Sequence, residues 1–564
     1  MTKHKHLIFK NTARLALLSV GIGVMAAGAM AANPDAPPSL RTEIANGTVR
    51  IPEPPNLAEF VRDKSAAIRL GKSLFWDMQV GSDGIQACAS CHFNAGADVR
   101  VKNTLNPGSP ALGAPANRTF NTGKPNYTLS AGDFPFHRKA DPNNIDSTVL
   151  FDSDDVRGSQ GVFLTRLVDI VPGQAEETGT LVPDTLFNVN GVNVRQVTAR
   201  TTPTAINAVF NKVNFWDGRA SDIFNGVSPR GGDDDNAVVY EVQPDGQVAP
   251  VRVSISEASL ASQAVGPPQD VTEMSYVGRT WPMIGKKMLS LRPLARQLVH
   301  PADSVLGSLS RNPLTGLNTA YADLIRQTFQ PKYWDSTTPV TIDGRTYSVM
   351  EANFSLFFGL AAQLYQATLI ADRTPFDRFQ EGDDAAMTVQ QQEGLNVFVG
   401  QGNCLSCHTG PLFMDGAFQK VGVRPVEEDP GQSGGSFKAP GIRNVELAGP
   451  FFHTGGAGSL RQIVDLYNRG GDFRNSSDLS PLDLSEGQKD ALVAFMKALT
   501  DDRVRYERAP FDHPQLFIPH GHPGDDKSVI NDGTGKATDQ LMELPTVGAS
   551  GRPLTQPVRG FLGQ

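Results

Sequence analysis

Two short motifs contain all four cysteines of the chain, and in each motif a histidine directly follows the second cysteine. They are Cys88-Ala-Ser-Cys91-His92 and Cys404-Leu-Ser-Cys407-His408. Two thiols at this spacing can add to the two vinyl groups of a haem, while the histidine binds the iron from one side. A zinc site or a Cys-x-x-Cys redox pair would leave both histidines unexplained. The spacing therefore predicts two covalent haem c groups, with His92 on the first iron and His408 on the second.

The elements that must position these motifs are helices. Apolar residues recur at helical spacing in residues 57–75 and 388–398, and each of these segments precedes one motif. The same supersecondary unit is thus expected twice. Further helices are predicted at residues 284–299, 318–330, 349–370, 459–467 and 484–499. We expect a mainly α fold of two cytochrome-c-like haem domains with long loops and a small β-hairpin insertion.

The domain boundaries follow from changes in composition along the chain. We predict a signal peptide over residues 1–31, a first haem domain over 32–310 and a second over 311–508. Residues 509–564 are rich in Pro and Gly and are predicted to form a loop-rich tail. Short alternating runs within about 224–256 predict the β-hairpin insertion in the first domain, with Asp233–Asp235 as a solvated turn.

The N-terminus has the features of an export signal. Lys3, Lys5, Lys10 and Arg14 precede a short apolar run, which is followed by a small-x-small cleavage site at Ala29-Met30-Ala31. A membrane anchor is the alternative interpretation, but the run is short and contains three glycines. Cleavage after Ala31 removes four basic and no acidic residues, so the net charge changes from −8 to −12. The expected location is the periplasm, with no membrane span.

The overall composition indicates a folded protein rich in loops. The chain has 564 residues, of which 39% are hydrophobic and 20% charged, and it contains 55 Gly and 40 Pro. A chain of this length can build several hydrophobic cores. The 51 basic and 59 acidic residues leave no overall positive field, which disfavours a nucleic-acid partner.

A family resemblance rests on five further segments. They are Phe215-Trp-Asp-Gly-Arg219, Ser262-Gln-Ala-Val-Gly-Pro267, Glu273-Met274, Pro440-Gly-Ile-Arg-Asn444 and Gly449-Pro-Phe-Phe-His453. With these segments the chain resembles the bacterial di-haem cytochrome c peroxidase and MauG superfamily, as a member with large insertions. The resemblance covers most of residues 65–505, and the segments are specific in combination although each is weak alone.

The resemblance implies a peroxidatic site at the first haem. In the family a Gln, a Pro and a Glu lie on the side of this haem that binds peroxide, and Gln263, Pro267 and Glu273 match their spacing. A carboxylate there can take a proton from peroxide and return it to the departing oxygen, while an amide can hold peroxide by hydrogen bonds. Glu273 is thus the expected general acid/base. The alternative is that Glu273 and Gln263 are ordinary surface residues.

A tryptophan between the two haems is also implied by the family pattern. Trp216 matches it, although it lies 47 residues before Gln263, a longer separation than in shorter relatives, which the insertion explains. Its indole can be oxidised transiently and pass an electron between the haems. An ordinary core position is the alternative for Trp216, and Trp281 and Trp334 are the other candidates for the relay.

Two departures from the peroxidase pattern concern the iron ligands. Many of the peroxidases carry a second histidine soon after the first haem histidine, which caps the resting iron; here position 108 is Gly, and no His lies between His92 and His137. The first iron is therefore expected to be open, with His137 as the alternative cap. At the second haem, Tyr467 occupies the place of the peroxidases' Met, as in the MauG branch.

The Tyr467 assignment has redox consequences. An oxygen ligand favours ferric and higher states, whereas Met favours ferrous iron. A core tyrosine or one facing a haem propionate is the alternative, in which case Met414 or no sixth ligand must be considered. The family also holds Ca²⁺ between its domains, and the resemblance implies backbone oxygens of Ala448 and Pro450 as ligands.

The leading hypothesis is a periplasmic di-haem peroxidase. It would reduce H₂O₂ with electrons from a small cytochrome c or cupredoxin and would react from the diferric state. The alternatives are a MauG-like oxidase of protein side chains, a rubber-oxygenase-like dioxygenase and a non-enzymatic electron-transfer cytochrome. The sequence leaves open whether the protein forms a homodimer.

Overall fold

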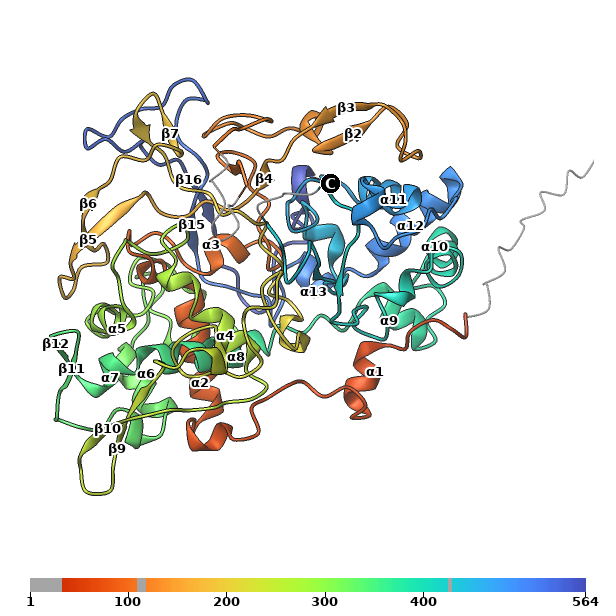
Figure 1. Cartoon of the computed structure of the whole chain (residues 1–564). Coiled ribbons are helices and arrows are strands. Elements are labelled where there is room, and N and C mark those ends of the chain that lie inside the picture. Colours follow the sequence, from red (N-terminus) through yellow and green to blue (C-terminus); the bar gives the residue numbers. More distant parts are fainter. Residues whose placement is uncertain (1–32, 109–117, 425–428, 564) are drawn as a thin grey trace, which may run out of the picture.

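The computed structural model describes residues 33–108, 118–424 and 429–563 (Figure 1). The predicted signal peptide lies outside these residues. The helices are α1 (Leu40–Ala45), α2 (Lys64–Trp76), α3 (Ala89–His92), α4 (Ser259–Ala264), α5 (Trp281–Leu289), α6 (Tyr321–Thr328), α7 (Val349–Ala352), α8 (Phe354–Gln366), α9 (Pro375–Gln380), α10 (Val389–Val399), α11 (Leu460–Arg469), α12 (Glu486–Ala498) and α13 (Asp502–Arg505).

The strands of the described residues form eight two-stranded antiparallel sheets. The pairs are β1 (Leu105–Asn106) with β4 (Val156–Arg157), β2 (His137–Lys139) with β3 (Val149–Asp152), β5 (Thr165–Asp169) with β6 (Thr178–Leu181), β7 (Asn188–Val189) with β8 (Val192–Asn193), β9 (Val239–Val242) with β10 (Val248–Val251), β11 (Val340–Ile342) with β12 (Arg345–Tyr347), β13 (Phe418–Gln419) with β14 (Phe437–Lys438), and β15 (Leu516–Pro519) with β16 (Leu541–Leu544). Helices form the hydrophobic cores, but loops and these ribbons make up so much of the chain that "mainly α" is too simple a description.

The first helical unit is built on the packing of α2 against α8. The side chain of Asp63 caps α2 by accepting a hydrogen bond from the Ala66 amide at 3.0 Å. Near the middle of the helix, a Cβ at Gly71 would overlap the carbonyl oxygen of Ala361 and approach the Cβ of Tyr365 to 2.8 Å. Only glycine permits this close approach, so Gly71 fixes how tightly the two helices pack.

The second helical unit repeats this arrangement with α10 and α12. Both helices begin with a capping box, formed by Thr388 with Gln391 and by Ser485 with Gln488. A Cβ at Gly394 would overlap the Ala491 carbonyl oxygen and lie 2.7 Å from the Cβ of Phe495. The predicted repeat of one supersecondary unit is therefore confirmed, down to a glycine packed against two residues four positions apart.

The domain boundary predicted between residues 310 and 311 does not coincide with the point where the hydrophobic core of the first unit ends and that of the second begins. α6 and α8 both pack against α2, and the cluster that begins at Leu57 continues to Leu364. The core of the second unit starts at Phe376 in α9. The helix that closes the first unit thus follows the predicted boundary, because α8 plays the part that α12 plays in the second unit.

The helix predicted over residues 284–299 is shorter in the structure. α5 ends at Leu289, and the residues that follow form turns that contain Pro293. Proline lacks an amide hydrogen and clashes with the preceding turn, so the apolar residues beyond it are buried without being helical. The helix predicted over 349–370 is divided at Asn353, whose side chain binds the backbone of Tyr240 at 2.7 Å.

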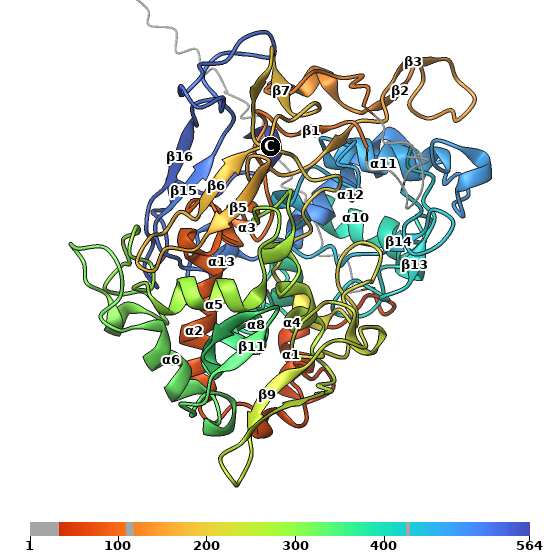
Figure 2. The same ribbon diagram turned by 60° about the vertical axis from the view of Figure 1, so that its left-hand side comes forward.

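The C-terminal tail packs onto the first unit. Phe511, Leu516, Ile518 and Leu544 are buried in one cluster with Ala89 of the first motif. β15 also contacts α3, and Figure 2 shows the ribbon of β15 and β16 beside this helix. The tail therefore lies over the first motif and is packed into the same core.

The predicted β-hairpin insertion is confirmed as β9 and β10. Its base is anchored in the first core, since Phe224 and Val239 are buried there. The hairpin lies at the end of the molecule away from α3 in both views (Figures 1 and 2). It therefore lies on the first unit and does not cover the first motif.

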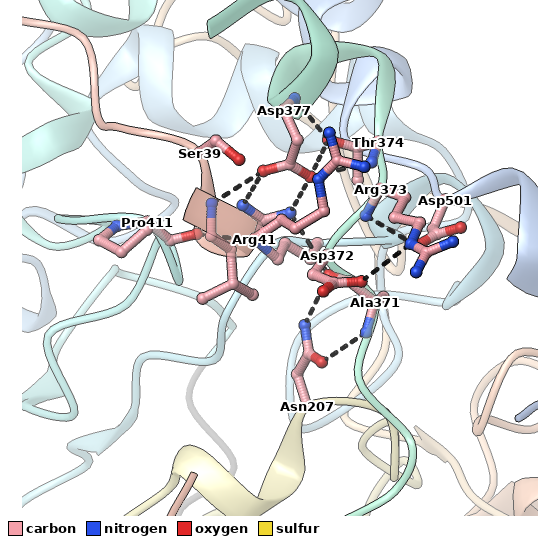
Figure 3. A network of polar contacts seen from close by, with 12 residues as sticks. Ser39, Arg41, Asn207, Ala371, Asp372, Arg373, Thr374, Asp377, Pro411 and Asp501 are labelled. Carbon is pink, nitrogen blue, oxygen red and sulfur yellow. Dashed lines mark hydrogen bonds and ion pairs between the residues drawn. The ribbon is translucent and has the colours of Figure 1, made fainter. Parts of the chain in front are cut away.

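A buried polar network joins the two units near the start of α9 (Figure 3). Asp377 accepts hydrogen bonds from the Arg443 guanidinium at 2.7 and 2.8 Å and from the Leu40 amide at 3.0 Å. On the other side of the segment, the Ala371 amide donates to Asn207 at 2.8 Å. Because the buried carboxylate is satisfied by several donors, the network holds the connection between the units in one arrangement.

No helix in the described ranges is long and apolar enough to cross a membrane.

Candidate haem sites

The first motif forms the short helix α3, which follows α2 after a loop that contains the 3-10 turn Met78–Val80. The Nδ1 atom of His92 lies 2.8 Å from the carbonyl oxygen of Gly96. A carbonyl can only accept, so Nδ1 carries the hydrogen and Nε2 keeps its lone pair. Burial lowers the pKa of His92 below its ordinary value, which keeps the ring neutral. This tautomer suits an axial iron ligand.

The second motif uses the same device. Residues Cys404–Ser406 form a single 3-10 turn after α10, and the Nδ1 atom of His408 lies 3.1 Å from the carbonyl oxygen of Phe413. Burial lowers the pKa of His408 as well. In both units the histidine is thus oriented by a backbone oxygen a few residues downstream, and its Nε2 lone pair remains for a metal.

The cysteines and a buried arginine fit a covalently held haem. All four thiols are free. Near Cys91, the fully buried Arg157 donates from Nη2 to Asp98 at 3.2 Å, but its Nε and Nη1 have no hydrogen-bond partner in the described part of the chain. Asp98 also pairs with Arg100 at 2.6 Å, so one carboxylate serves two guanidinium groups. An anionic group such as a haem propionate would complete this cluster.

A cavity of about 120 Å³ lies where the two units meet. Residues of the segment 201–216 line one side, and residues of 412–452 line the other. Trp216 is among the lining residues; its Nε1 donates to the Thr201 carbonyl at 2.7 Å, and its ring meets His453 edge to face at 6.3 Å. Trp216 thus lies at the border of the two units, and its place between two haems stays a prediction.

The other two tryptophans that the sequence proposed for this position lie elsewhere. Trp281 packs between Phe354 and Phe358 in the first core. Trp334 donates to the Phe329 carbonyl at 3.1 Å at the edge of that core. Neither lines the cavity between the units.

Backbone packing brings Glu273 next to the first motif. Gln86, two residues before Cys88, donates from Nε2 to the carbonyl oxygens of Gln160 and Gly161 at 2.9 Å. Gly161 in turn lies against the backbone of Thr272 and Glu273, since a Cβ there would lie 2.7 Å from the Glu273 carbonyl oxygen and overlap that of Thr272. A single extended segment therefore separates the motif from the glutamate.

The electrostatics of Glu273 indicate a desolvated carboxyl group. Although the residue is only half-buried, loss of solvent around the carboxyl and the neighbouring Asp270 raise its pKa to about 8, against an opposing effect of Arg219. Burial also raises the pKa of the Cys88 and Cys91 thiols to about 12, and the Glu273 charge adds to both shifts. The carboxyl group is thus within electrostatic range of the first motif, where it can exchange protons near neutral pH.

Gln263 and Pro267 flank the same region. Gln263 lies near the end of α4, and Pro267 begins the 3-10 turn Pro267–Gln269. Between them, a Cβ at Gly266 would lie 3.3 Å from the ring of Phe215, and the Arg219 guanidinium stacks on that ring at 4.2 Å. The Phe215–Arg219 segment therefore packs against the turn between Gln263 and Pro267, and its Arg219 lies within electrostatic range of Glu273.

Tyr467 lies in α11 and faces the second motif. Burial raises the pKa of its hydroxyl above the ordinary value, and the neighbouring Cys404 and Cys407 add to this effect. Met414, the alternative ligand, directly follows Phe413, whose carbonyl binds the His408 ring. The loop of Met414 is thus fixed on the histidine side, which favours Tyr467 for the opposite face.

His137 does not accompany the first motif. Its Nδ1 lies 2.9 Å from Asp152, its ring lies 4.9 Å from that of Phe473, and it lines a cavity with Arg469 of α11. These contacts place it beside the second unit and argue against a cap on the first iron. Gly108, at the position of the family's capping histidine, donates its amide to Asn106 at 2.9 Å.

The predicted calcium ligands lie at the border of the units. Ala448 and Pro450 both line the cavity between them, and Asn94 of the first unit donates to the adjacent Leu447 carbonyl at 3.2 Å. Within the described ranges, no group of three or more His, Cys, Asp or Glu side chains could hold a metal ion. A site of backbone oxygens would not form such a group, so calcium stays a prediction.

Two residues beside the first motif were missed by the sequence analysis. Arg157 gave no signal, because a lone arginine in a loop has no pattern. Trp76 lies in the helix that precedes the motif, twelve positions before Cys88, and was treated as part of an apolar helix face. No sequence pattern distinguishes Trp76 from the apolar residues around it.

Comparisons with known proteins give a consistent result. A sequence model of the di-haem cytochrome c peroxidase family matches residues 177–385. Cytochrome-c peroxidase IdrP2 of Denitromonas iodatirespirans is 30% identical over 242 residues, which are 35% of this chain and 62% of that protein. Methylamine utilization protein MauG of Methylorubrum extorquens is 32% identical over 168 residues, 28% of this chain and 46% of that protein.

The chain thus spans less than two thirds of the length of these curated relatives. Among solved structures, a MauG-like protein associated with microbial copper homeostasis is 15% identical, with a TM-score of 0.41, and the match covers 82% of this chain and 96% of that one.

Proposed function

The chain belongs to the di-haem cytochrome c peroxidase and MauG family, and from this premise we propose that it reduces H₂O₂ to water with electrons from a small redox protein. The reaction consumes two electrons and two protons for each peroxide. The proposed donor is a small cytochrome c or cupredoxin. Export to the periplasm, through residues 1–31, is part of the same proposal.

The residues that would hold the two haems are the cysteines and histidines of the two motifs. Bound there, a haem supplies an iron that accepts peroxide and stores oxidising equivalents. Cys88, Cys91 and His92 would hold the first, and Arg157 would pair with one of its propionates. Cys404, Cys407 and His408 would hold the second.

Glu273 is proposed to move the protons at the first site. Its carboxylate would accept a proton from peroxide and return it to the oxygen that leaves as water. A pKa of about 8 suits both steps, because the group is then neither a weak base nor a weak acid near neutral pH. Gln263, close to Pro267 on the same side, would hold peroxide or water through its amide.

Tyr467 and Trp216 are proposed to share the oxidising equivalents between the two sites. Trp216 lies at the border of the units and would pass electrons between them. The Tyr467 oxygen would stabilise oxidised iron at the second site, so that the diferric protein reacts without prior reduction. Gly108, at the position of the capping histidine, is consistent with a first site that is open in the resting state.

The observation that carries the proposal is the placement of Glu273 beside the first motif with a raised pKa. The test is rapid mixing of the diferric protein with H₂O₂, followed by absorption spectra. We expect the spectrum to change without added reductant, and to change far more slowly in Glu273→Gln. The matched control is Glu176→Gln, which removes an exposed carboxylate and should leave the rate unchanged. No reaction until a reductant is added would contradict the diferric mechanism.

A MauG-like oxidation of another protein's side chain is the second candidate, and Tyr467 is the observation that favours it. The two functions differ in the electron source. If the peroxide-treated protein accepts electrons readily from a small cytochrome c, the peroxidase function is supported. If it is reduced slowly by such donors and instead oxidises an added protein, the MauG-like function is supported.

A further inference from the structure

Aromatic rings form a continuous series on the His92 side of the first motif. The ring of Phe75 lies 6.1 Å from that of His92, and the Tyr365 ring meets Phe75 edge to face at 5.5 Å. Trp76, the next residue in α2, lies 6.1 Å from Phe75 between ring centroids. The series therefore begins at the histidine that would bind the first iron and leads to Trp76 and Tyr365.

Trp76 occupies an unusually specific environment within this series. Its Nε1 donates to the Tyr365 hydroxyl at 2.9 Å, and its ring is stacked on His513 from the C-terminal tail at 4.8 Å. Both Trp76 and Tyr365 are buried. The indole is thus fixed by a hydrogen bond at its edge and by an aromatic ring on its face, with three separate segments of the chain meeting at one side chain.

Charged groups around this environment favour a positive charge on the indole. Lys72 pairs with Asp303 at 2.9 Å and with Asp512 at 3.3 Å, and all three side chains are buried. On the other side, Glu507 lies 3.1 Å from His513 Nε2 and pairs with Arg552. Three carboxylates therefore lie around the indole together with Lys72 and Arg552, and in a medium of low polarity these carboxylates favour a positive charge on the indole.

From these observations we propose that Trp76 is a redox-active residue that donates one electron to the first haem site after peroxide has oxidised it. The proposal rests on the proposed function, since H₂O₂ supplies the oxidising equivalents. One electron leaves the indole and reduces the oxidised site by one equivalent. The indole becomes a cation radical and keeps its Nε1 proton, which stays hydrogen-bonded to Tyr365. The electron donor of the enzyme restores the neutral indole.

Trp76 is a better electron donor here than Tyr365. Oxidation of a tyrosine releases its proton, which needs an acceptor, and burial raises the pKa of Tyr365 well above its ordinary value. The carboxylates Asp303 and Asp512 contribute to this shift in the same direction. The same charges that hold the phenol proton stabilise a cation on the neighbouring indole, so one environment favours oxidation of Trp76 and opposes that of Tyr365.

The closing experiment is freeze-quench electron paramagnetic resonance on the haem-loaded, diferric protein after H₂O₂ is added without a donor. We expect an organic radical whose signal narrows when the protein contains ring-deuterated tryptophan. The signal should be lost in Trp76→Phe, which keeps an aromatic ring, and kept in Trp281→Phe, a matched change of a buried tryptophan in the first core. In Tyr365→Phe the indole loses its acceptor, so the radical should form but decay faster.

Two outcomes would overturn the proposal and can be told apart. If the haem spectrum does not respond to peroxide, the proposed function fails and this step with it. If the haem spectrum responds but the radical persists in Trp76→Phe, or is lost instead in Trp216→Phe, only the role of Trp76 fails. If Trp76→Phe does not fold, peptide mapping of the unsubstituted protein after peroxide treatment tests the same role. Oxygen addition at Trp76 and not at Trp281 supports the proposed role of Trp76, and the reverse contradicts that role.

Discussion

The two helical units share a framework but differ on the side opposite each histidine. α2 with α8 and α10 with α12 pack through a glycine at the same relative place, and each motif follows the first helix of its pair. Both histidines are held by a backbone oxygen. Glu273 lies beside the first motif and Tyr467 beside the second. Under the proposed function, the repeated part would hold a prosthetic group in each unit, while a single side chain brought from elsewhere in the chain would decide its chemistry.

The tail adds a second difference. Phe511, Leu516, Ile518 and Leu544 of the tail pack on the first unit, where His513 completes the surroundings of Trp76. Near the end of the tail, Phe561 lies against Gly449 and lines a cavity with Leu460 of the second unit. When the units are aligned on Gly71 and Gly394, Val399 takes the place of Trp76 and Phe495 that of Tyr365. Phe495 packs edge to face with Phe376 and Phe413. Phenylalanine is not readily oxidised, so the redox-active aromatic series is expected in the first unit alone.

The most severe way to break the shared framework is a side chain at the packed glycines. Gly71→Ala and Gly394→Ala each place a methyl group against a backbone carbonyl, which cannot move without separating the helices. We expect each change to cost about 3 kcal/mol or more of the free energy of unfolding. Gly487→Ala in α12 is the matched control, because nothing lies within 4 Å of its added Cβ. Denaturant unfolding measures all three; equal effects would contradict the packing argument.

The next largest effect is loss of one haem without the other. Cys88→Ala combined with Cys91→Ala should remove the haem of the first unit, and Cys404→Ala with Cys407→Ala that of the second. Mass spectrometry of the intact protein should show one haem fewer in each case. Because the framework of each unit is separate, the remaining haem should keep its spectrum. Simultaneous loss of both would show that the two units do not load independently.

The shared framework was largely accessible from the sequence, because its signals are local. Each five-residue motif follows a segment with helical spacing of apolar residues, so the helix and the motif are found together. The capping residues mark where α10 and α12 begin. The sequence assigned α8, the helix that closes the first unit, to the second domain. α8 lies far from α2 in the chain, and its apolar pattern does not show which helix it packs against. Such pairing depends on tertiary packing, which spacing along the sequence does not encode.

The side opposite each histidine was accessible only through the family resemblance. Glu273 is 181 residues from His92, and only the packing of Gly161 between them brings it close. Arg157 and Trp76 lack any pattern that marks them as special. Their environments come from segments of the tail and of the loops, so the structure was needed to find them.

At the level of rate, Glu273→Gln should sharpen the comparison. We expect the reaction with peroxide to slow by roughly a hundredfold to ten-thousandfold, the range for general acid/base catalysis. In the unchanged protein the first step needs the ionised carboxylate, so the rate should rise as the pH approaches about 8 and level off above it. The variant should lack this rise, since an amide does not ionise in this range. Stopped-flow rates against pH measure both; an unaltered profile would exclude Glu273 as the base.

Tyr467→Met should alter the second unit and spare the first. Replacing an oxygen ligand by a thioether favours the ferrous state, so the potential of the second haem should rise by on the order of 0.1 V, within the roughly 0.8 V that axial ligands span. Peroxide should still bind at the first site. Spectroelectrochemistry measures the potentials, with Tyr506→Phe, a tyrosine outside both motifs, as the control. A shift in the potential of the first haem instead of the second would show that Tyr467 does not act at the second haem.

The smallest effect is expected from the hairpin that only the first unit carries. Replacing the connection between Val242 and Val248 by Asn-Gly shortens it to a two-residue turn that suits the antiparallel pair. The connection is solvated and the hairpin lies away from α3, so both haems, the peroxide rate and the stability should stay within about 0.5 kcal/mol of the original.

The base of the insertion is expected to behave differently. The Phe224 ring is fully buried and approaches Gly359 of α8, where an added Cβ would lie 2.7 Å from it. Phe224→Ala should therefore cost about 3 to 5 kcal/mol, because it opens a cavity against the helix that closes the first unit. Deleting all of residues 224–256 would remove this contact together with the solvated tip.

Loss of a haem after such a deletion would thus report on the core and not on the hairpin. Only the shortened turn separates the effect of the hairpin tip from the effect of the core contact. A loss of peroxide turnover in the shortened-turn variant, with both haems in place, would give the hairpin a part in the reaction.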